Sequence, residues 1–430
     1  MEREPADLLI THVGRLITCA AADGPKRGAA QHEIEAIHDA AIAVGSGRIL
    51  AVGLTEALDG RFAPARRIDA AGGLVTPGFV DPHTHACYAG DRADEFELRI
   101  AGATYQQIMA AGGGIMRTVR ATRAASVEQL VAETRPRLDR MLAHGTTTVE
   151  IKTGYGLTTE DELKMLDALA RLDAGHPISI VPTFLGAHAI PAEYRDNPDA
   201  YVDMVVDEML PAVARWRDAH PGAPVPRFCD VFCETGAFSL EQSRRILERA
   251  RELGFELKIH VDEFDPLGGT PLAVELGAVS ADHLVATPSE HVALLARSAT
   301  VAIALPGTPF GLGHYHFTPG RAIIDAGGAL ALATDCNPGT SVCESIPLMI
   351  ALACRAMRIT PAEALHAATI NAAYGIGMGH EIGSLQPGKR ADLLIHDVPS
   401  ETHLAYRFGS NPVKMVIKDG RVVWERGALP

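Results

Sequence analysis

At 430 residues, the chain is too long for one small core and suits one large barrel-type domain with a smaller companion. It holds 39 Lys and Arg against 53 Asp and Glu, a formal net charge of -14, and has no basic run. This balance argues against nucleic acid or an anionic membrane as partner, and 47% hydrophobic residues indicate a well-buried globular protein.

The first residues, MEREPADLL, lack the charged, apolar and small-residue pattern of a signal peptide. No apolar run along the chain approaches the roughly 18 residues that a membrane span requires. The seven cysteines contain no CxxC pair, so neither a disulfide framework nor a cysteine zinc site is predicted. We therefore expect a cytoplasmic protein with reduced cysteines.

Short apolar strands separated by Gly and charged turns occur near both ends of the chain. In the first part they lie in residues 7–18, 41–53 and 65–78, and in the last part in residues 383–397 and 412–427. Two such segments can share one sheet domain. The sequence predicts a small β-sandwich domain built from residues 1–77 and 386–430.

Between these segments, residues 78–385 alternate apolar runs of strand length with stretches of helical period. Eight candidate strands are GFVDPHTH, TTTVEIKTG, ISIVPTFLGAH, RFCDVFCE, FELKIHVDE, GAVSADHL, TVAIALP and ALALATDC. This alternation predicts an α/β fold of the (β/α)8 barrel type. A doubly wound sheet would need a Gly-rich phosphate turn after the first strand, where this chain has His-x-His. The Gly run in GGGIMRTVRATRAA, residues 112–125, is expected to be a flexible active-site loop.

Polar side chains follow most of the predicted strands where these strands end, which is where barrel enzymes place catalytic residues. His83 and His85 lie one residue apart, so they point to the same side of a strand. The strand ends carry His83, His85, Lys152, Tyr155, His188, Glu234, His260, Asp262, Glu263, His283, Asp335 and Asn337. The strand that ends at Pro306 offers nothing comparable.

Four of these residues form a candidate metal shell: His83, His85, His260 and Asp335. Three imidazoles and one carboxylate suit Zn²⁺, and would also hold Fe²⁺ or Mn²⁺, because affinity order alone does not select the metal in a cell. For His260 taken alone, a hydrogen-bonded core histidine is an equal alternative. The agreement of four strand ends favours the metal site.

Several motifs together resemble the amidohydrolase superfamily, namely PGFVDPHTH, HVDE, the His of the sixth strand, ATD and GSLQPGKRADLLIHD. More narrowly, HTHACYAGDRADEFELR, GGGIMRTVRATRAA, EIKTGYGL, FLGAHAIP and TDCNPGTS are similar to the imidazolonepropionase family. The similarity runs through nearly the whole chain. It implies a hydrolase that opens the ring of 4-imidazolone-5-propanoate to N-formimino-L-glutamate in histidine degradation.

The resemblance also implies roles for individual positions. One divalent metal, zinc or iron, would be held by His83, His85, His260 and Asp335. Substrate contacts would come from Arg92, Tyr155, His188, Glu263, Asn337, Gly339 and Thr340, and His283 would lie beside the metal or act in catalysis. Other superfamily members bridge two metals with a carboxylated lysine near the place of Lys152; since one metal is implied here, we interpret Lys152 as structural. We also expect a homodimer that acts on a small-molecule substrate.

The chemistry of these residue types fits ring opening. A divalent cation lowers the pKa of its water from 15.7 to about 7, and Asp335 can accept a proton from that water. Glu263 can orient the ring or return a proton to its nitrogen, and His283 can polarise the carbonyl. Arg92 can bind the propanoate carboxylate through two parallel N–H bonds, with the hydroxyls of Tyr155 and Tyr105 as further donors. The alternative for Arg92 is a surface salt bridge with Asp91 or Glu95.

Two other functions stay open. A deaminase of cytosine, guanine or a similar base also has a barrel His followed by Glu three residues later, but it would not need Arg92 to bind a carboxylate. A non-catalytic relative in an assembly role is the other alternative. Such chains usually lose their metal histidines, and this sequence keeps all four proposed ligands.

Overall fold

The computed structural model describes residues 3–103, 107 and 112–428. Its centre is a sheet of eight parallel strands that neighbour one another in chain order from β8 to β15. The strands are β8 (Phe79–Asp81), β9 (Thr146–Lys152), β10 (Ser179–Ala187), β11 (Phe228–Cys233), β12 (Glu256–Val261), β13 (Ser280–His283), β14 (Val301–Ala304) and β15 (Leu330–Leu332). The eight predicted strands are confirmed.

The last and first strands of this sheet meet and close the barrel. Just beyond β15, the Asp335 amide donates to the His83 carbonyl at 3.1 Å, and the His85 amide donates to the Cys336 carbonyl at 3.0 Å. At the end of β8, the Asp81 carboxylate accepts hydrogen bonds from the Thr334 amide at 3.0 Å and from the Thr334 hydroxyl at 2.6 Å. These bonds hold the first and last strand ends, and the candidate ligands on them, side by side.

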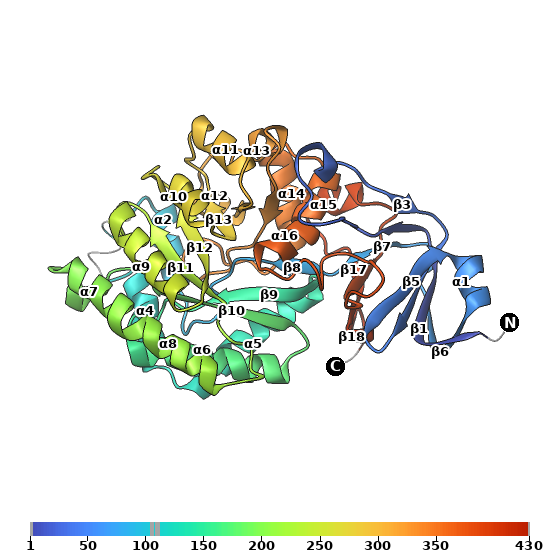
Figure 1. Cartoon of the computed structure of the whole chain (residues 1–430), viewed down its shortest axis with the longest axis horizontal. Coiled ribbons are helices and arrows are strands. Elements are labelled where there is room, and N and C mark those ends of the chain that lie inside the picture. Colours follow the sequence, from blue (N-terminus) through green and yellow to red (C-terminus); the bar gives the residue numbers. More distant parts are fainter. Residues whose placement is uncertain (1–2, 104–106, 108–111, 429–430) are drawn as a thin grey trace.

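Helices cover the outside of the barrel (Figure 1). Their apolar faces pack inward, and several begin at a residue that caps the helix: the Ser126 hydroxyl accepts from the Gln129 amide, and Ser239 forms a reciprocal cap with Gln242. The helices are α2 (Ala93–Ile100), α4 (Ile115–Ala124), α5 (Val127–Ala143), α6 (Thr159–Gly175), α7 (Pro198–Met204), α8 (Leu210–Ala219), α9 (Leu240–Glu252), α10 (Gly269–Leu276), α11 (Ser289–Ala296), α12 (Gly307–Leu312), α13 (Gly320–Asp325), α14 (Ile346–Ala356), α15 (Pro361–Ala367), α16 (Ile370–Gly375) and α17 (Thr402–Tyr406). The single turns are η1 (Gly28–Gln31), η2 (Ala192–Tyr194) and η3 (Val205–Met209).

The expectation of a flexible loop over residues 112–125 is wrong for most of that stretch. Residues 115–124 form helix α4. The side chains of Ile115, Met116 and Val119 recur at helical spacing and pack against the main apolar core. The Gly run therefore precedes a helix, and the apolar period after it outweighs the glycines.

Strands from both ends of the chain form two further sheets, at the right of Figure 1. One has the order β5-β4-β1-β6 and the other β18-β17-β16-β7-β2-β3, so β7 of the first part pairs with β16 of the last. Apolar residues of both sheets, among them Ile10, Ile42, Ile395 and Ile417, share one buried cluster. The division of the chain at residues 77 and 385 stays a prediction. The elements are β1 (Glu4–Val13), β2 (Arg15–Ile17), β3 (Ala36–Ile37), β4 (Ala40–Gly45), β5 (Arg48–Leu54), α1 (Thr55–Arg61), β6 (Phe62–Asp69), β7 (Leu74–Pro77), β16 (Leu393–His396), β17 (Val413–Lys418) and β18 (Arg421–Glu425).

The cysteines and the helix lengths bear on two further expectations from the sequence. All seven cysteines are free thiols, and five of them are buried. Across the part of the chain that the structure describes, helices long and apolar enough to cross a membrane are absent.

Candidate metal centre

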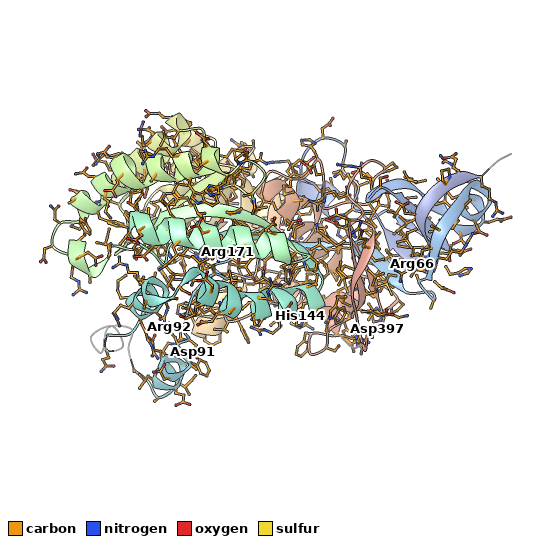
Figure 2. The ribbon with its side chains drawn as sticks, turned by 90° about the horizontal axis from the view of Figure 1, so that it is seen from below. Arg66, Asp91, Arg92, His144, Arg171 and Asp397 are labelled. Atoms are coloured by element: carbon orange, nitrogen blue, oxygen red, sulfur yellow. The ribbon has the colours of Figure 1, made fainter. Side chains whose placement is uncertain are left out.

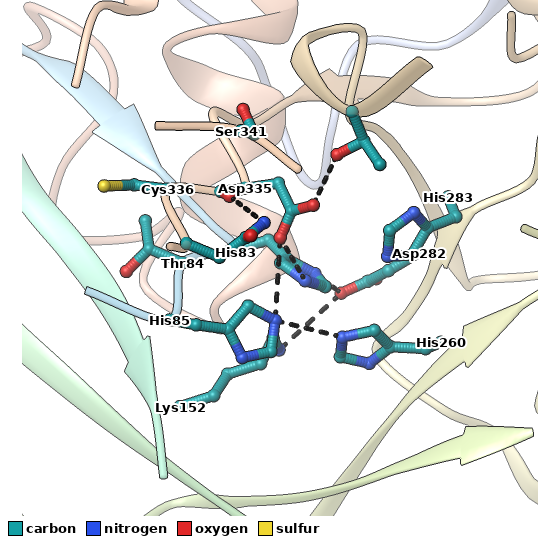
Figure 3. A network of polar contacts seen from close by, with 12 residues as sticks. His83, Thr84, His85, Lys152, His260, Asp282, His283, Asp335, Cys336 and Ser341 are labelled. Atoms are coloured by element: carbon teal, nitrogen blue, oxygen red, sulfur yellow. Dashed lines mark hydrogen bonds and ion pairs between the residues drawn. The ribbon is translucent and has the colours of Figure 1, made fainter. Parts of the chain in front are cut away.

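Three histidine rings meet at the C-terminal mouth of the barrel (Figure 3). His83 and His85 follow β8 and His260 lies in β12, and all three are buried. The Nε2 atoms of His85 and His260 are 3.3 Å apart, and the ring centroids of His83 and His260 are 4.4 Å apart. The convergence predicted from His-x-His is therefore present in the fold.

Asp335 completes this group from the end of the eighth strand. Its Oδ1 lies 3.6 Å from Nε2 of His83 and also 3.6 Å from Nε2 of His85. Its Oδ2 accepts a hydrogen bond from the hydroxyl of Thr308, at the start of α12. Sequence reasoning missed Thr308, because the strand before it ends at a proline and shows no titratable group there. We call His83, His85, His260 and Asp335 the candidate ligand set.

A second group of charged residues lies deeper in the barrel, beneath the candidate ligand set. It consists of Glu150, Lys152, Asp230, Lys258 and Asp282, all with side chains fully buried, and we call it the buried charge layer. Asp282 Oδ2 accepts from Nδ1 of His83 at 2.6 Å, and Asp230 Oδ2 faces Nδ1 of His260 at 3.0 Å. Sequence reasoning missed both aspartates. Their signal was present, since Asp230 is a charge inside an otherwise apolar strand and Asp282 directly precedes the strand-end His283.

The donor atoms of this site fit a metal ion. Because Asp282 holds Nδ1 of His83, the lone pair of that ring is on Nε2, a buried atom without a hydrogen-bond partner in the described part of the chain. Donor atoms of His83, His85 and His260 all lie within 4.8 Å of one another. The same holds for a second group, His83, His283 and Asp335. Neutral imidazoles and a carboxylate are zinc and iron ligands.

Burial sets the protonation of these groups. It is the main cause that lowers the pKa of His83 and of His85 well below 6.5, with neighbouring cationic groups adding to it. It likewise lowers the pKa of His188 to about 3 and raises the pKa of Asp335 to about 6. The imidazoles of His83, His85 and His188 are therefore neutral at pH 7 and have lone pairs available for a cation.

His283 and Glu263 lie beside the ligand set. His283 Nδ1 is 3.7 Å from Glu263 Oε2, and the ring centroids of His260 and His283 are 5.2 Å apart. Burial first, then the charges of Asp335 and Glu234, raises the pKa of Glu263 well above 4.5. A raised pKa favours the protonated form of this carboxyl group, which is the form that can donate a proton.

Three non-glycine residues at these strand ends have left-handed backbone conformations. The φ angles are 53° at Asp262, 76° at His283 and 52° at Asp335. Such conformations cost on the order of 1–3 kcal/mol each and are typical of functional sites. Here they turn the chain just where the strands deliver side chains to the mouth of the barrel. Asp262, a strand-end residue in the sequence, points elsewhere and accepts from the hydroxyls of Thr270 and Thr287.

The substrate-contact candidates surround the same mouth. His188 stacks on His85 with centroids 4.7 Å apart, and the Tyr155 ring is 5.3 Å from His188. Asn337 binds its own loop: its amide oxygen accepts from the Gly339 and Thr340 amides, each at 2.8 Å. Its role in this structure is to shape the loop. Tyr105 lies outside the described residues.

Arg92 lies beside Asp91 at the start of α2 (Figure 2). Its Nε donates to Glu95 Oε2 at 2.8 Å, so one part of the salt-bridge alternative holds. The terminal guanidinium nitrogens lie against Gly339, where a Cβ would come within 2.5 Å of Nη1. Beside it is a pocket of about 340 Å³ lined by residues that include Arg92, Phe96, Gly339, Thr340 and Val342. The glycine at 339 is what lets the cation approach this loop.

The profile of the Amidohydrolase family matches residues 74–423. The chain belongs to this family. The chain is 63% identical over 418 residues to an imidazolonepropionase of Herpetosiphon aurantiacus. It is 52% identical over 422 residues to an imidazolonepropionase of Chloroflexus aggregans. The first match covers 97% of both chains, and the second covers 98% of this chain and 99% of the relative. The fold is also similar to that of a zinc-bound adenosine deaminase of Xanthomonas campestris, with a TM-score of 0.72 at 22% identity, covering 100% of this chain and 95% of that one.

Proposed function

We propose that this chain hydrolyses 4-imidazolone-5-propanoate to N-formimino-L-glutamate. The observation that carries the proposal is the convergence of His83, His85, His260 and Asp335 at the barrel mouth, with the cation Arg92 against Gly339 on the loop that follows Asp335. Support comes from curated relatives named imidazolonepropionase, 44–63% identical over nearly the full length. The chain is thus a hydrolase that acts on a cyclic amide C–N bond.

One divalent metal per chain, zinc or iron, is proposed for the candidate ligand set. When bound, such a cation lowers the pKa of a water molecule and polarises the oxygen of a carbonyl group. The buried charge layer has two ammonium groups and three carboxylates, so it carries one formal negative charge. Asp335 adds a second, and one divalent cation balances the two.

The surroundings of Lys152 support a single metal. Carboxylation of a lysine needs a neutral amine. Burial alone would lower the pKa of Lys152, but the carboxylates of Asp230, Glu150 and Asp282 together raise it above its ordinary value. A carboxylated lysine would also add an anion among three carboxylates, a costly arrangement in a buried layer.

Ring opening requires that the oxygen of water adds to the carbonyl carbon, that the bond from this carbon to the ring nitrogen breaks, and that the nitrogen takes up a proton. Asp335 is the proposed acceptor of the proton from water, with the Thr308 hydroxyl fixing its other oxygen. Glu263, buried beside His283, is the proposed donor to the departing nitrogen. His283 is proposed to polarise the carbonyl group.

The remaining candidates are proposed to bind the substrate. Arg92 would bind the propanoate through its terminal N–H groups, and His188 and Tyr155 would pack against the ring. Gly339 and Thr340 would form the loop wall beside Arg92. Glu263 would also contact the ring nitrogen, and Asn337 would hold the loop in shape. Tyr105 stays a predicted donor.

A deaminase of cytosine or guanine is the competing function. The test is to offer purified protein freshly generated imidazolonepropanoate, cytosine and guanine, with and without a chelator. We expect loss of imidazolonepropanoate ultraviolet absorbance, abolished by the chelator, and no ammonia from either base. Ammonia release without ring opening would favour the deaminase. No turnover of any of these would favour the assembly role.

Two further expectations are part of this proposal. We propose a homodimer in the cytoplasm. Sedimentation equilibrium tests the first of these, with a mass of twice 45.6 kDa as the expected result. Cell fractionation tests the second.

A further inference from the structure

The buried charge layer comes from inward-facing positions of neighbouring strands. Glu150 and Lys152 are two residues apart in β9, Asp230 lies in β11, Lys258 in β12 and Asp282 in β13. Side chains two apart in a strand share a face, so these five groups meet in the barrel interior. All five side chains are fully buried. Removing five charged groups from water costs free energy, which only close pairing of opposite charges can offset.

Two carboxylates of the layer each face one histidine of the candidate ligand set. Asp282 accepts from Nδ1 of His83 at 2.6 Å, and Asp230 Oδ2 is 3.0 Å from Nδ1 of His260. A proton held on Nδ1 leaves the lone pair on Nε2, the atom that faces the proposed metal. The orientation of both ligands therefore depends on where these two carboxylates are held.

The ammonium of Lys152 lies between these two carboxylates. It is 2.8 Å from Asp230 Oδ2 and 3.7 Å from Asp282 Oδ2, and Glu150 Oε2 fixes it from a third side at 2.9 Å. We propose that Lys152 is a positioning residue for the metal: by joining Asp230 and Asp282 it orients His260 and His83 toward one point. This inference rests on the metal site of the proposed function and assigns Lys152 a role beyond stability.

Lys258 shows why the inference is specific to Lys152. It is an equally buried ammonium, but it binds the carbonyl oxygens of Pro82 and Gly375 at 2.8 and 3.4 Å. It reaches Glu150 and Asp282 but, among the described residues, forms no ion pair with Asp230. Among the residues that the structure describes, only Lys152 is within ion-pair distance of both carboxylates behind the two ligand histidines.

The test compares metal binding in Lys152→Met with that in a control for the loss of a buried lysine. Lys418 provides the control: in the terminal sheets its ammonium is buried and 2.6 Å from Asp392 Oδ2, far from the barrel mouth in the fold (β17 in Figure 1). Full-length wild-type, Lys152→Met and Lys418→Met proteins are stripped of metal and titrated with Zn²⁺ against a chromogenic chelator. Urea unfolding and the visible spectrum of the Co²⁺ forms are recorded in parallel.

We expect the Zn²⁺ affinity of Lys152→Met to fall about 10- to 100-fold, with a changed Co²⁺ spectrum. Lys418→Met should lose stability but bind Zn²⁺ as the wild type does. Wild-type affinity and an unchanged spectrum in Lys152→Met would overturn this proposal alone. Wild-type protein that binds no Zn²⁺ would overturn the metal site as well. If Lys152→Met does not fold, Lys152→Gln, which removes the charge that pairs with Asp230 and is too short to reach both carboxylates, is judged by the same two outcomes.

Discussion

Replacing Arg92 by Met tests how the substrate is recognised. Among the described residues, the hydrogen bond of Arg92 is the one from Nε to Glu95, which leaves the two terminal nitrogens to bind a carboxylate through two parallel N–H bonds. The guanidinium lies against Gly339 and lines a pocket together with Gly339 and Thr340. Methionine keeps most of the bulk of the side chain and removes its charge.

The expected loss follows from the bonds removed. A hydrogen bond to a charged group contributes about 1.5–3 kcal/mol, and two are lost, partly offset by water that can solvate the propanoate at the open mouth. We therefore expect a loss of about 2–4 kcal/mol of transition-state binding. At about 1.4 kcal/mol for each tenfold change, this is a decrease of about 30- to 700-fold in kcat/KM.

The assay is the rate of imidazolonepropanoate absorbance loss at low substrate concentration. Arg171→Met is the matched control, because Arg171 on helix α6 is exposed and pairs with Glu128 of helix α5, away from Arg92 and Glu95. It should change kcat/KM little. An imidazolone with a methyl group in place of the propanoate should be turned over equally by wild type and Arg92→Met. Unchanged kcat/KM on the propanoate, or an equal loss on both substrates, would refute the assignment.

Two further changes probe other parts of the account. Glu263→Gln removes the proton donor but keeps the shape of the side chain, so metal content should stay at the wild-type level while kcat falls about 10²-fold or more. Loss of metal in this variant would show that Glu263 is a metal ligand. A normal kcat would show that it is a loop residue without a role in proton transfer. Burial lowers the pKa of His396 to about 3, from 6.5 in the unfolded chain. Below that unfolded value only the unfolded state takes up this proton, so the unfolding free energy falls with decreasing pH. His396→Gln should reduce that slope by up to about 1.4 kcal/mol per pH unit between about pH 5.5 and 4. Urea titrations over a pH series measure it, and equal slopes would contradict the reasoning.

The barrel and the convergence of the ligands could be predicted from the sequence because both are local signals. Each barrel strand is a short apolar run, and His83, His85, His260 and Asp335 stand where such runs end. Parallel strands of a barrel bring those ends to one face, so no knowledge of distances is needed to group them.

The residues that sequence reasoning missed are not charged groups at the ends of apolar runs. Asp230 and Asp282 are inside their strands, so a search of strand ends passes over them. Thr308 carries no charge and begins a helix after a proline. Their roles come from which atoms face one another across strands, and a single sequence does not record that. For helix α4, glycines suggested a loop, but packing of apolar side chains on the core decided the structure.

The central claim is that one divalent metal in the candidate ligand set drives ring opening. The direct measurement is the rate of imidazolonepropanoate ring opening as metal-free protein receives increasing Zn²⁺ or Fe²⁺. The account predicts no activity before addition, a linear rise, and a plateau at one equivalent per chain, with Asp335→Ala inactive throughout. Full activity of the stripped protein in chelator, or a plateau at two equivalents, would contradict it.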